Sequence, residues 1–95
     1  MMLPNVHVCC PRRADFQLHA WPDGAVVHDE ASGDIHALSP VAGELLHSIV
    51  KAGQSTPERL AQALLGEAPT DGDVSMVHKL LLEFESLGFI EFCDA

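Results

Sequence analysis

The stretch that decides the fold is His28–Leu46, which reads HDEASGDIHALSPVAGELL. Its first residues end one strand, residues 31–34 form a tight turn, and residues 34–38 form the next strand. Ser39-Pro40 then starts a helix, because the serine oxygen can accept a hydrogen bond from a free N–H group and proline needs no N–H in the first turn. Two paired strands are therefore predicted to run directly into a capped helix.

Upstream of this stretch, residues 16–21 alternate between the two faces of a predicted strand that buries one of them. Pro22-Asp23-Gly24 forms a turn, since proline fixes φ and the residues after it tolerate positive φ. Residues 25–29 form the strand that follows. Because the connections are short, the strands at 16–21, 25–29 and 34–38 are predicted to pair as an antiparallel meander.

Three helices are expected downstream, at residues 40–52, 57–66 and 73–87. Apolar side chains recur at helical spacing in each, and a glycine follows each apolar stripe. Thr70 and Asp73 have the spacing of a capping box. Residues 89–93 alternate again and predict a short terminal strand. The fold class is therefore α+β: a small winged-helix-like domain with a three-stranded antiparallel sheet followed by three helices.

The length and the local patterns define one domain. Ninety-five residues bury a single modest core, and 47% hydrophobic content indicates a folded chain. Residues 1–14 contain two prolines and no clear period, so they are expected to form an irregular N-terminal arm. Residues 15–95 are expected to form the folded domain.

The charge of the chain argues against binding to nucleic acid and to anionic membranes. The net charge is −9, and only five lysines and arginines are present, scattered along the chain. A DNA-binding protein typically makes about 6–10 phosphate contacts, each of which needs a cation. The N-terminus has neither the basic region nor the long apolar run of a signal peptide. Together with an odd number of cysteines, this predicts a protein of the reducing cytoplasm.

No constellation of catalytic residues is found, so the protein is expected not to be an enzyme and to need no cofactor. The paired carboxylates sit in expected turns or on a solvated helix face, and Cys9-Cys10 lacks a positioned base. Six histidines lack the spacing of metal ligands, which predicts no metal site: His7, His19, His28, His36, His47 and His78. Three of them fall on neighbouring strands, but the sequence leaves their register open.

Leu82 is an unusual residue on the third predicted helix. It points away from the apolar stripe of that helix, among polar residues. An isolated exposed leucine is common in proteins. A leucine on the outer face of a helix that flanks a sheet edge is also what a partner groove needs. Both interpretations stay open at this point.

The order of elements, together with particular residues, resembles the PqqD family of small peptide-binding chaperones, which are RiPP recognition element-like. The chain looks most similar to the HPr-rel-A branch of that family. The resemblance covers residues 16–92 and rests on Trp21, Ala25–His28, the segment SGDIHALSP at Ser32–Pro40, Leu45-Leu46, Thr56–Leu60 and Leu80–Ile90.

This resemblance implies a non-enzymatic domain that binds a precursor or leader peptide and presents it to a modifying enzyme. It implies an extended peptide that lies beside the third strand and against the third helix, by strand addition. The peptide-binding residues implied are Asp34, Ile35, His36, Ala37, Leu38, His78, Leu81, Leu82 and Glu85. The alternatives are a winged-helix nucleic-acid binder and a small dimerisation protein, in which the strand edge and Leu82 lie in a homodimer interface.

Overall fold

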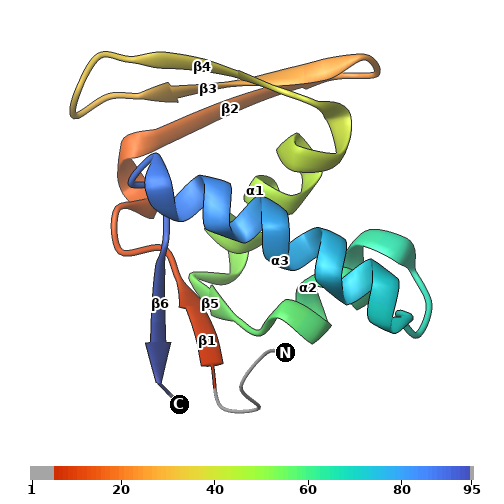
Figure 1. The fold of residues 1–95 in the computed structure, drawn as a ribbon. Helices are drawn as coiled ribbons and strands as arrows, with labels where there is room; N and C mark the ends of the chain where they lie inside the picture. The colour runs from red at the N-terminus through yellow and green to blue at the C-terminus, as the bar shows by residue number, and fades with distance from the viewer. Residues whose placement is uncertain (1–5, 95) are drawn as a thin grey trace.

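Two small antiparallel sheets and three helices make up residues 6–94, the part of the chain that the computed structural model describes (Figure 1). One sheet lies at the top of the view and the other at the bottom, with helices between them. The predicted α+β class, with a three-stranded meander followed by three helices, is confirmed. The second sheet is an addition, since the sequence analysis predicts only its last strand.

The upper sheet has the strand order β2–β3–β4. Its strands are Phe16–Trp21, Gly24–Asp29 and Ile35–Leu38. Leu18 lies opposite Val27, which lies opposite His36, so these three share the face that packs toward the helices. Because successive side chains alternate between faces, His19 and His28 lie on the other face. The sheet therefore separates His36 from the other two strand histidines.

The lower sheet has the order β5–β1–β6. Its strands are Gln54–Ser55, Val6–Cys9 and Glu91–Asp94. The expectation of an irregular arm over residues 1–14 is wrong for Val6–Cys9, because β1 is paired along both of its edges. A single 3-10 turn, Arg13–Asp15, then leads into β2. Residues 1–5 of the expected arm lie outside the described residues.

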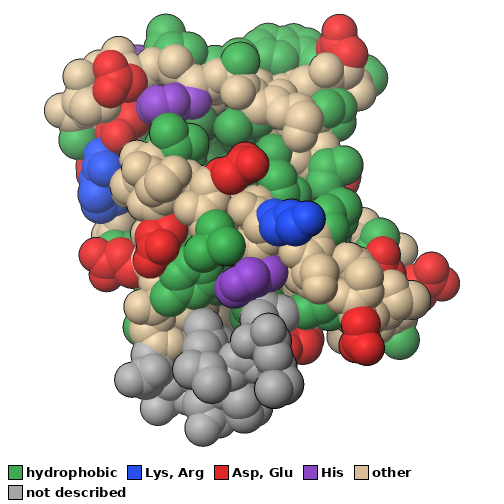
Figure 2. All heavy atoms as spheres, viewed as in Figure 1, with side chains coloured by type: hydrophobic (Ala, Val, Ile, Leu, Met, Phe, Trp, Pro, Cys, Tyr) green, Lys and Arg blue, Asp and Glu red, His purple; other side chains and the backbone are tan. Residues whose placement is uncertain are grey.

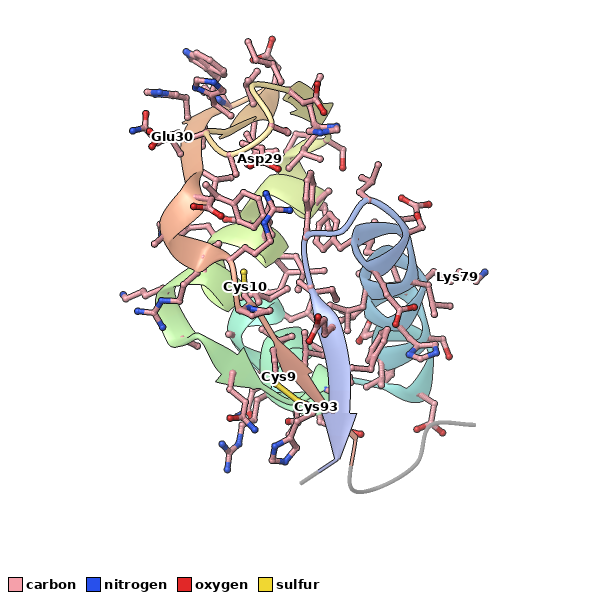
Figure 3. The ribbon with its side chains drawn as sticks, turned by 90° about the vertical axis from the view of Figure 1, so that its left-hand side faces the viewer. Cys9, Cys10, Asp29, Glu30, Lys79 and Cys93 are labelled. Carbon is pink, nitrogen blue, oxygen red and sulfur yellow. A yellow bond between two sulfur atoms is a disulfide. The ribbon has the colours of Figure 1, made fainter. Side chains whose placement is uncertain are left out.

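Cys9 of β1 and Cys93 of β6 form a disulfide across the lower sheet (Figure 3). Their Cα atoms are 6.7 Å apart, and 84 positions separate them in the sequence. Disulfides persist mainly in oxidising compartments, so this bond does not fit the reducing cytoplasm that the sequence analysis expects. Cys10, the neighbouring cysteine, is a buried free thiol that donates to the Phe89 carbonyl.

The three helices begin at the predicted side-chain caps. They are α1 (Pro40–Ala52), α2 (Pro57–Leu65) and α3 (Asp71–Ser86). The Ser39 and Thr56 oxygens accept from backbone N–H groups of the first turns of α1 and α2. The predicted capping box is confirmed, with Thr70 and Asp73 bonded reciprocally. α3 starts two residues earlier than predicted because Thr70 is its N-cap.

The core is formed by residues of the three helices, of the inner face of the upper sheet and of β1. Its fully buried side chains include Leu45, Leu46, Ile49, Val77, Leu81, Phe84 and Phe89. Gly43 allows a close approach of α1 to β3, since a Cβ at this position would lie 2.5 Å from the Cβ of Ala25. The upper sheet therefore packs closely against α1 at β3, its central strand.

Candidate functional site

β4 presents an open edge. Within residues 6–94 it pairs only with β3. The Asp29 N–H donates to the Asp34 carbonyl at 2.9 Å. This hydrogen bond shows which residues of β4 bond to β3 and which do not. In an antiparallel pair, the residues alternate between those that bond to the partner strand and those whose N–H and C=O point away from it. The backbone groups of Ile35 and Ala37 therefore face outward, while those of His36 face β3.

One flank of α3 faces away from β4 and toward β6. The ring of His78 lies 6.0 Å from the ring of Phe92 in β6. Figure 1 shows β4 above α3 and β6 below it. Leu82 and Glu85 follow His78 by four and seven residues, so they share its side of the helix. We call this side of α3 the β6 flank.

The other flank of α3 faces β4 and is largely apolar. It carries Met76, Leu80 and Glu83, and Leu87, the C-cap just after α3, continues the spacing of i, i+4, i+7 and i+11. Met76 is 38% exposed and Leu87 is 47% exposed, whereas Leu80 packs partly against the core. Figure 2 shows hydrophobic side chains gathered between α3 and the upper sheet. We call this side of α3 the β4 flank, and we use the name β4 groove for the surface that the β4 flank and the open β4 edge form together.

The residues predicted to bind the peptide lie in different places in the structure. The structure places Ile35–Leu38 in the open edge strand β4, with Asp34 just before that strand. It does not bring His78, Leu82 and Glu85 to that edge, because they lie on the β6 flank. Leu81 requires a correction: it is completely buried in the core, between the two flanks, and presents no surface to a ligand.

Arg12 holds the two walls of the β4 groove together. Its Nη2 lies 2.7 and 2.6 Å from the two carboxylate oxygens of Asp29, at the end of β3. Its Nη1 donates to the carbonyl of Gly88, just after α3, at 3.4 Å. Asp29 in turn accepts from the Ala31 N–H in the turn that leads to β4. One guanidinium therefore links the end of α3 to the turn that positions β4.

The Arg12–Asp29 pair shifts the pKa values of both groups. Burial alone would raise the pKa of Asp29, which is 5% exposed. The hydrogen bonds from Arg12 and from the Ala31 N–H outweigh that effect and hold the pKa of Asp29 below its usual value. The hydrogen bond to Asp29 raises the pKa of Arg12. The pair is therefore ionised at neutral pH.

Aromatic rings fill the space behind this ion pair. The ring of Phe89 lies 5.0 Å from that of His36 and 5.2 Å from that of Phe16, both in edge-on contact. The Arg12 guanidinium lies over the Phe16 ring at 5.3 Å. These contacts join the inner face of β4 to the chain just beyond α3.

The sequence analysis missed Arg12, Asp29 and the β4 flank. Asp29 could have been found from the sequence, because it follows Ala25 and Val27 at every second position and so points to the same buried face. A buried carboxylate needs a hydrogen-bonding or charged partner. Its partner could not be found from the sequence, since Arg12 was assigned to an irregular arm. The two flanks of α3 are separable only when the neighbours of the helix are known.

The described residues offer little to metal or thiol chemistry. Within residues 6–94, no group of three or more metal-ligating side chains is found. Burial raises the pKa of the Cys10 thiol, which leaves it protonated at neutral pH and so a poor nucleophile. No helix in this part of the chain is long and apolar enough to cross a membrane. The β4 groove, in contrast, offers outward backbone groups along the β4 edge and apolar side chains along the β4 flank.

The fold and the groove define a class of protein: a small α+β domain in which an edge strand lies open beside a helix. No family model matches this chain, and no curated protein matches it. The solved structure of TbiB1 in complex with the TbiA(beta) leader peptide is similar, with a TM-score of 0.59. The similarity covers 81% of this chain and 90% of TbiB1, at 18% sequence identity. The two chains thus share a fold.

Proposed function

We propose that this protein is a peptide-recognition domain that binds an extended precursor or leader peptide in the β4 groove. The observation that carries this proposal is the open β4 edge beside an apolar helix flank. Backbone groups at such an edge can hydrogen-bond any extended peptide, and the adjacent side chains select among sequences. The shared fold with TbiB1, whose structure holds a leader peptide, supports the same function.

The geometry suggests how the peptide lies. A strand added to β4 would bond to the outward N–H and C=O groups of Ile35 and Ala37, and alternate peptide side chains would face Met76, Leu80 and Leu87. In this arrangement the peptide contacts the β4 flank and does not contact His78, Leu82 and Glu85, which lie on the β6 flank. The arrangement retains residues 34–38 as the strand that the peptide extends.

The role in a pathway follows from the resemblance to PqqD-like chaperones. We propose that the domain does not react with the peptide but presents it to a modifying enzyme. The resemblance to the HPr-rel-A branch belongs to this proposal and rests on the sequence motifs.

A titration followed by nuclear magnetic resonance tests the proposal. The labelled protein would be mixed with a candidate leader peptide encoded beside its gene, and amide exchange would be measured with and without the peptide. We expect the amides of Ile35 and Ala37 to become protected, because they would donate to the added strand. Protection limited to α1 and α2 would contradict this site.

A further inference from the structure

A pocket lies at the edge of the upper sheet opposite to β4, between β2 and α1. Its volume is about 460 Å³, which is within the range of pockets that hold ligands. Its lining includes Leu18, Ala20 and Ala25 of the upper sheet and Pro40, Gly43, Glu44 and His47 of α1. The residues from α1 are spaced at i, i+3, i+4 and i+7, so they form one flank of that helix.

The pocket exists because its floor is built from small residues. Gly43 and Ala25 are in such close contact that α1 touches the sheet at this point. Ala20 lies opposite Ala25 in the β2–β3 ladder and adds no bulk beside it. Toward the β2 edge the larger side chains of Leu18 and Trp21 line the pocket, and a hollow between them and α1 remains open to solvent.

β2 is also an open edge. Among the described residues it pairs only with β3, and it lies at the end of the upper sheet opposite to β4. The Glu30 N–H donates to the Asp15 carbonyl at 2.8 Å, which fixes the alternation of this ladder. The backbone N–H and C=O groups of Leu18 and Ala20 therefore point away from β3. The pocket thus combines free backbone groups with an apolar hollow.

The charge around the pocket selects its occupant. Glu44 is the only acidic or basic side chain in the lining besides His47, and both are exposed. The whole chain carries a net charge of −9, so a cationic partner is attracted and a second copy of this acidic chain is repelled.

We infer that the β2 edge and this pocket bind an extended segment of a partner protein in which a large apolar side chain is flanked by lysine or arginine. The apolar side chain enters the hollow over Ala20 and Gly43. The basic side chains lie against Glu44. The segment backbone bonds to Leu18 and Ala20. This site is independent of the proposed peptide function, because β2 and β4 are opposite edges of one sheet.

Two matched probe peptides test this inference. Each is a five-residue synthetic peptide with a central phenylalanine between two valines; one has lysine at both ends and the other has glutamate. Each would be titrated into labelled full-length protein at about 150 mM salt, to limit long-range charge effects. We expect the lysine peptide to shift the amides of Leu18 and Ala20, with the glutamate peptide binding at least about threefold more weakly.

Two variants and one control complete the design. Glu44→Lys reverses the exposed charge of the pocket and is expected to weaken binding of the lysine peptide by about threefold or more. Ala20→Leu fills the hollow and is expected to weaken binding of the lysine peptide by about tenfold. Glu67→Lys changes the same charge on an exposed residue outside the pocket lining and should leave binding unchanged. If Ala20→Leu fails to fold, Glu44→Lys decides the outcome.

Several results would overturn the inference. Equal binding of the two peptides, equal effects of Glu44→Lys and Glu67→Lys, or the absence of shifts at β2 would each reject it. Shifts at Leu18 and Ala20 when the protein alone is concentrated would show that a second copy occupies this edge, which would also reject it.

Discussion

At the scale of single residues, Arg12 and Asp29 connect sequence positions that no local pattern relates. Asp29 is buried at the end of β3, and Arg12 lies in the segment between the two sheets. Their ion pair and the Arg12 bond to Gly88 link the end of β3 to the chain just after α3. The contact of Phe89 with His36 is a second link between β4 and this part of the chain.

We expect Arg12→Gln to lower the midpoint of thermal unfolding at pH 7, because it leaves the Asp29 carboxylate buried without its cation. The folded-state pKa of Asp29 is depressed, so the stabilisation is fully present above the unfolded pKa of about 3.9. It is lost as the pH falls through the lower folded pKa. The difference between the unfolding midpoints of Arg12→Gln and the unmodified chain should therefore shrink as the pH is lowered below about 4.

The matched control is Arg13→Gln, since Arg13 is an exposed neighbour with no ion pair to any residue between 6 and 94. It should change the midpoint little at any pH. Equal effects of the two substitutions across the pH range would contradict the role assigned to Arg12.

At the scale of secondary-structure elements, α3 has two partly exposed flanks that differ in their neighbours. The β6 flank carries Leu82, which is 46% exposed, and the β4 flank carries Leu87 with nearly the same exposure. The two leucines therefore match in exposure and differ in flank. They also differ in position, since Leu82 lies within α3 and Leu87 is its C-cap.

We expect Leu87→Gln to weaken binding of the leader peptide by at least about 1 kcal/mol, the scale of a truncated interface contact. Leu82→Gln should bind nearly as well as the unmodified chain. Isothermal titration calorimetry would measure both. If Leu82→Gln gave the larger loss, the β6 flank of the sequence analysis would be the peptide-binding surface after all.

At the scale of the whole molecule, the disulfide closes the chain between its first and last strands. Cys9–Cys93 joins β1 to β6 over 84 positions, so it restricts the unfolded chain strongly. We expect Cys93→Ser to lower the free energy of unfolding by about 2–4 kcal/mol in urea. Reducing agent should lower the stability of the unmodified chain and leave that of Cys93→Ser unchanged. Equal stability with and without reductant would show that the disulfide does not form in solution.

The charge distribution also yields a prediction for the whole molecule. Lys79 is the only basic residue on α3, where it points out to solvent among four acidic residues of the same helix (Figure 3). We expect no binding to generic duplex DNA tighter than about 10⁻⁴ M at 150 mM salt. Tight, salt-sensitive binding in a fluorescence anisotropy titration would instead favour the nucleic-acid alternative.

The sequence by itself determined the elements of the upper sheet and the three helices. Those patterns are local: alternation of side chains, Ser/Thr-Pro starts and glycine stops act within a few residues of the chain. The β4 strand and its open edge could be predicted because Ser32–Pro40 specifies the turn, the strand and the following cap. The same local logic identified the capping box at Thr70.

Only the tertiary structure decided which side of α3 meets β4, how β1 pairs and which residue Arg12 binds. Each of these depends on contacts between residues that are far apart in the sequence, such as Val8 with Phe92 or Arg12 with Gly88. The helical period of α3 permits either flank to face the sheet edge. The packing of His78 against β6 selects one of them, and that choice sets the apolar wall of the β4 groove.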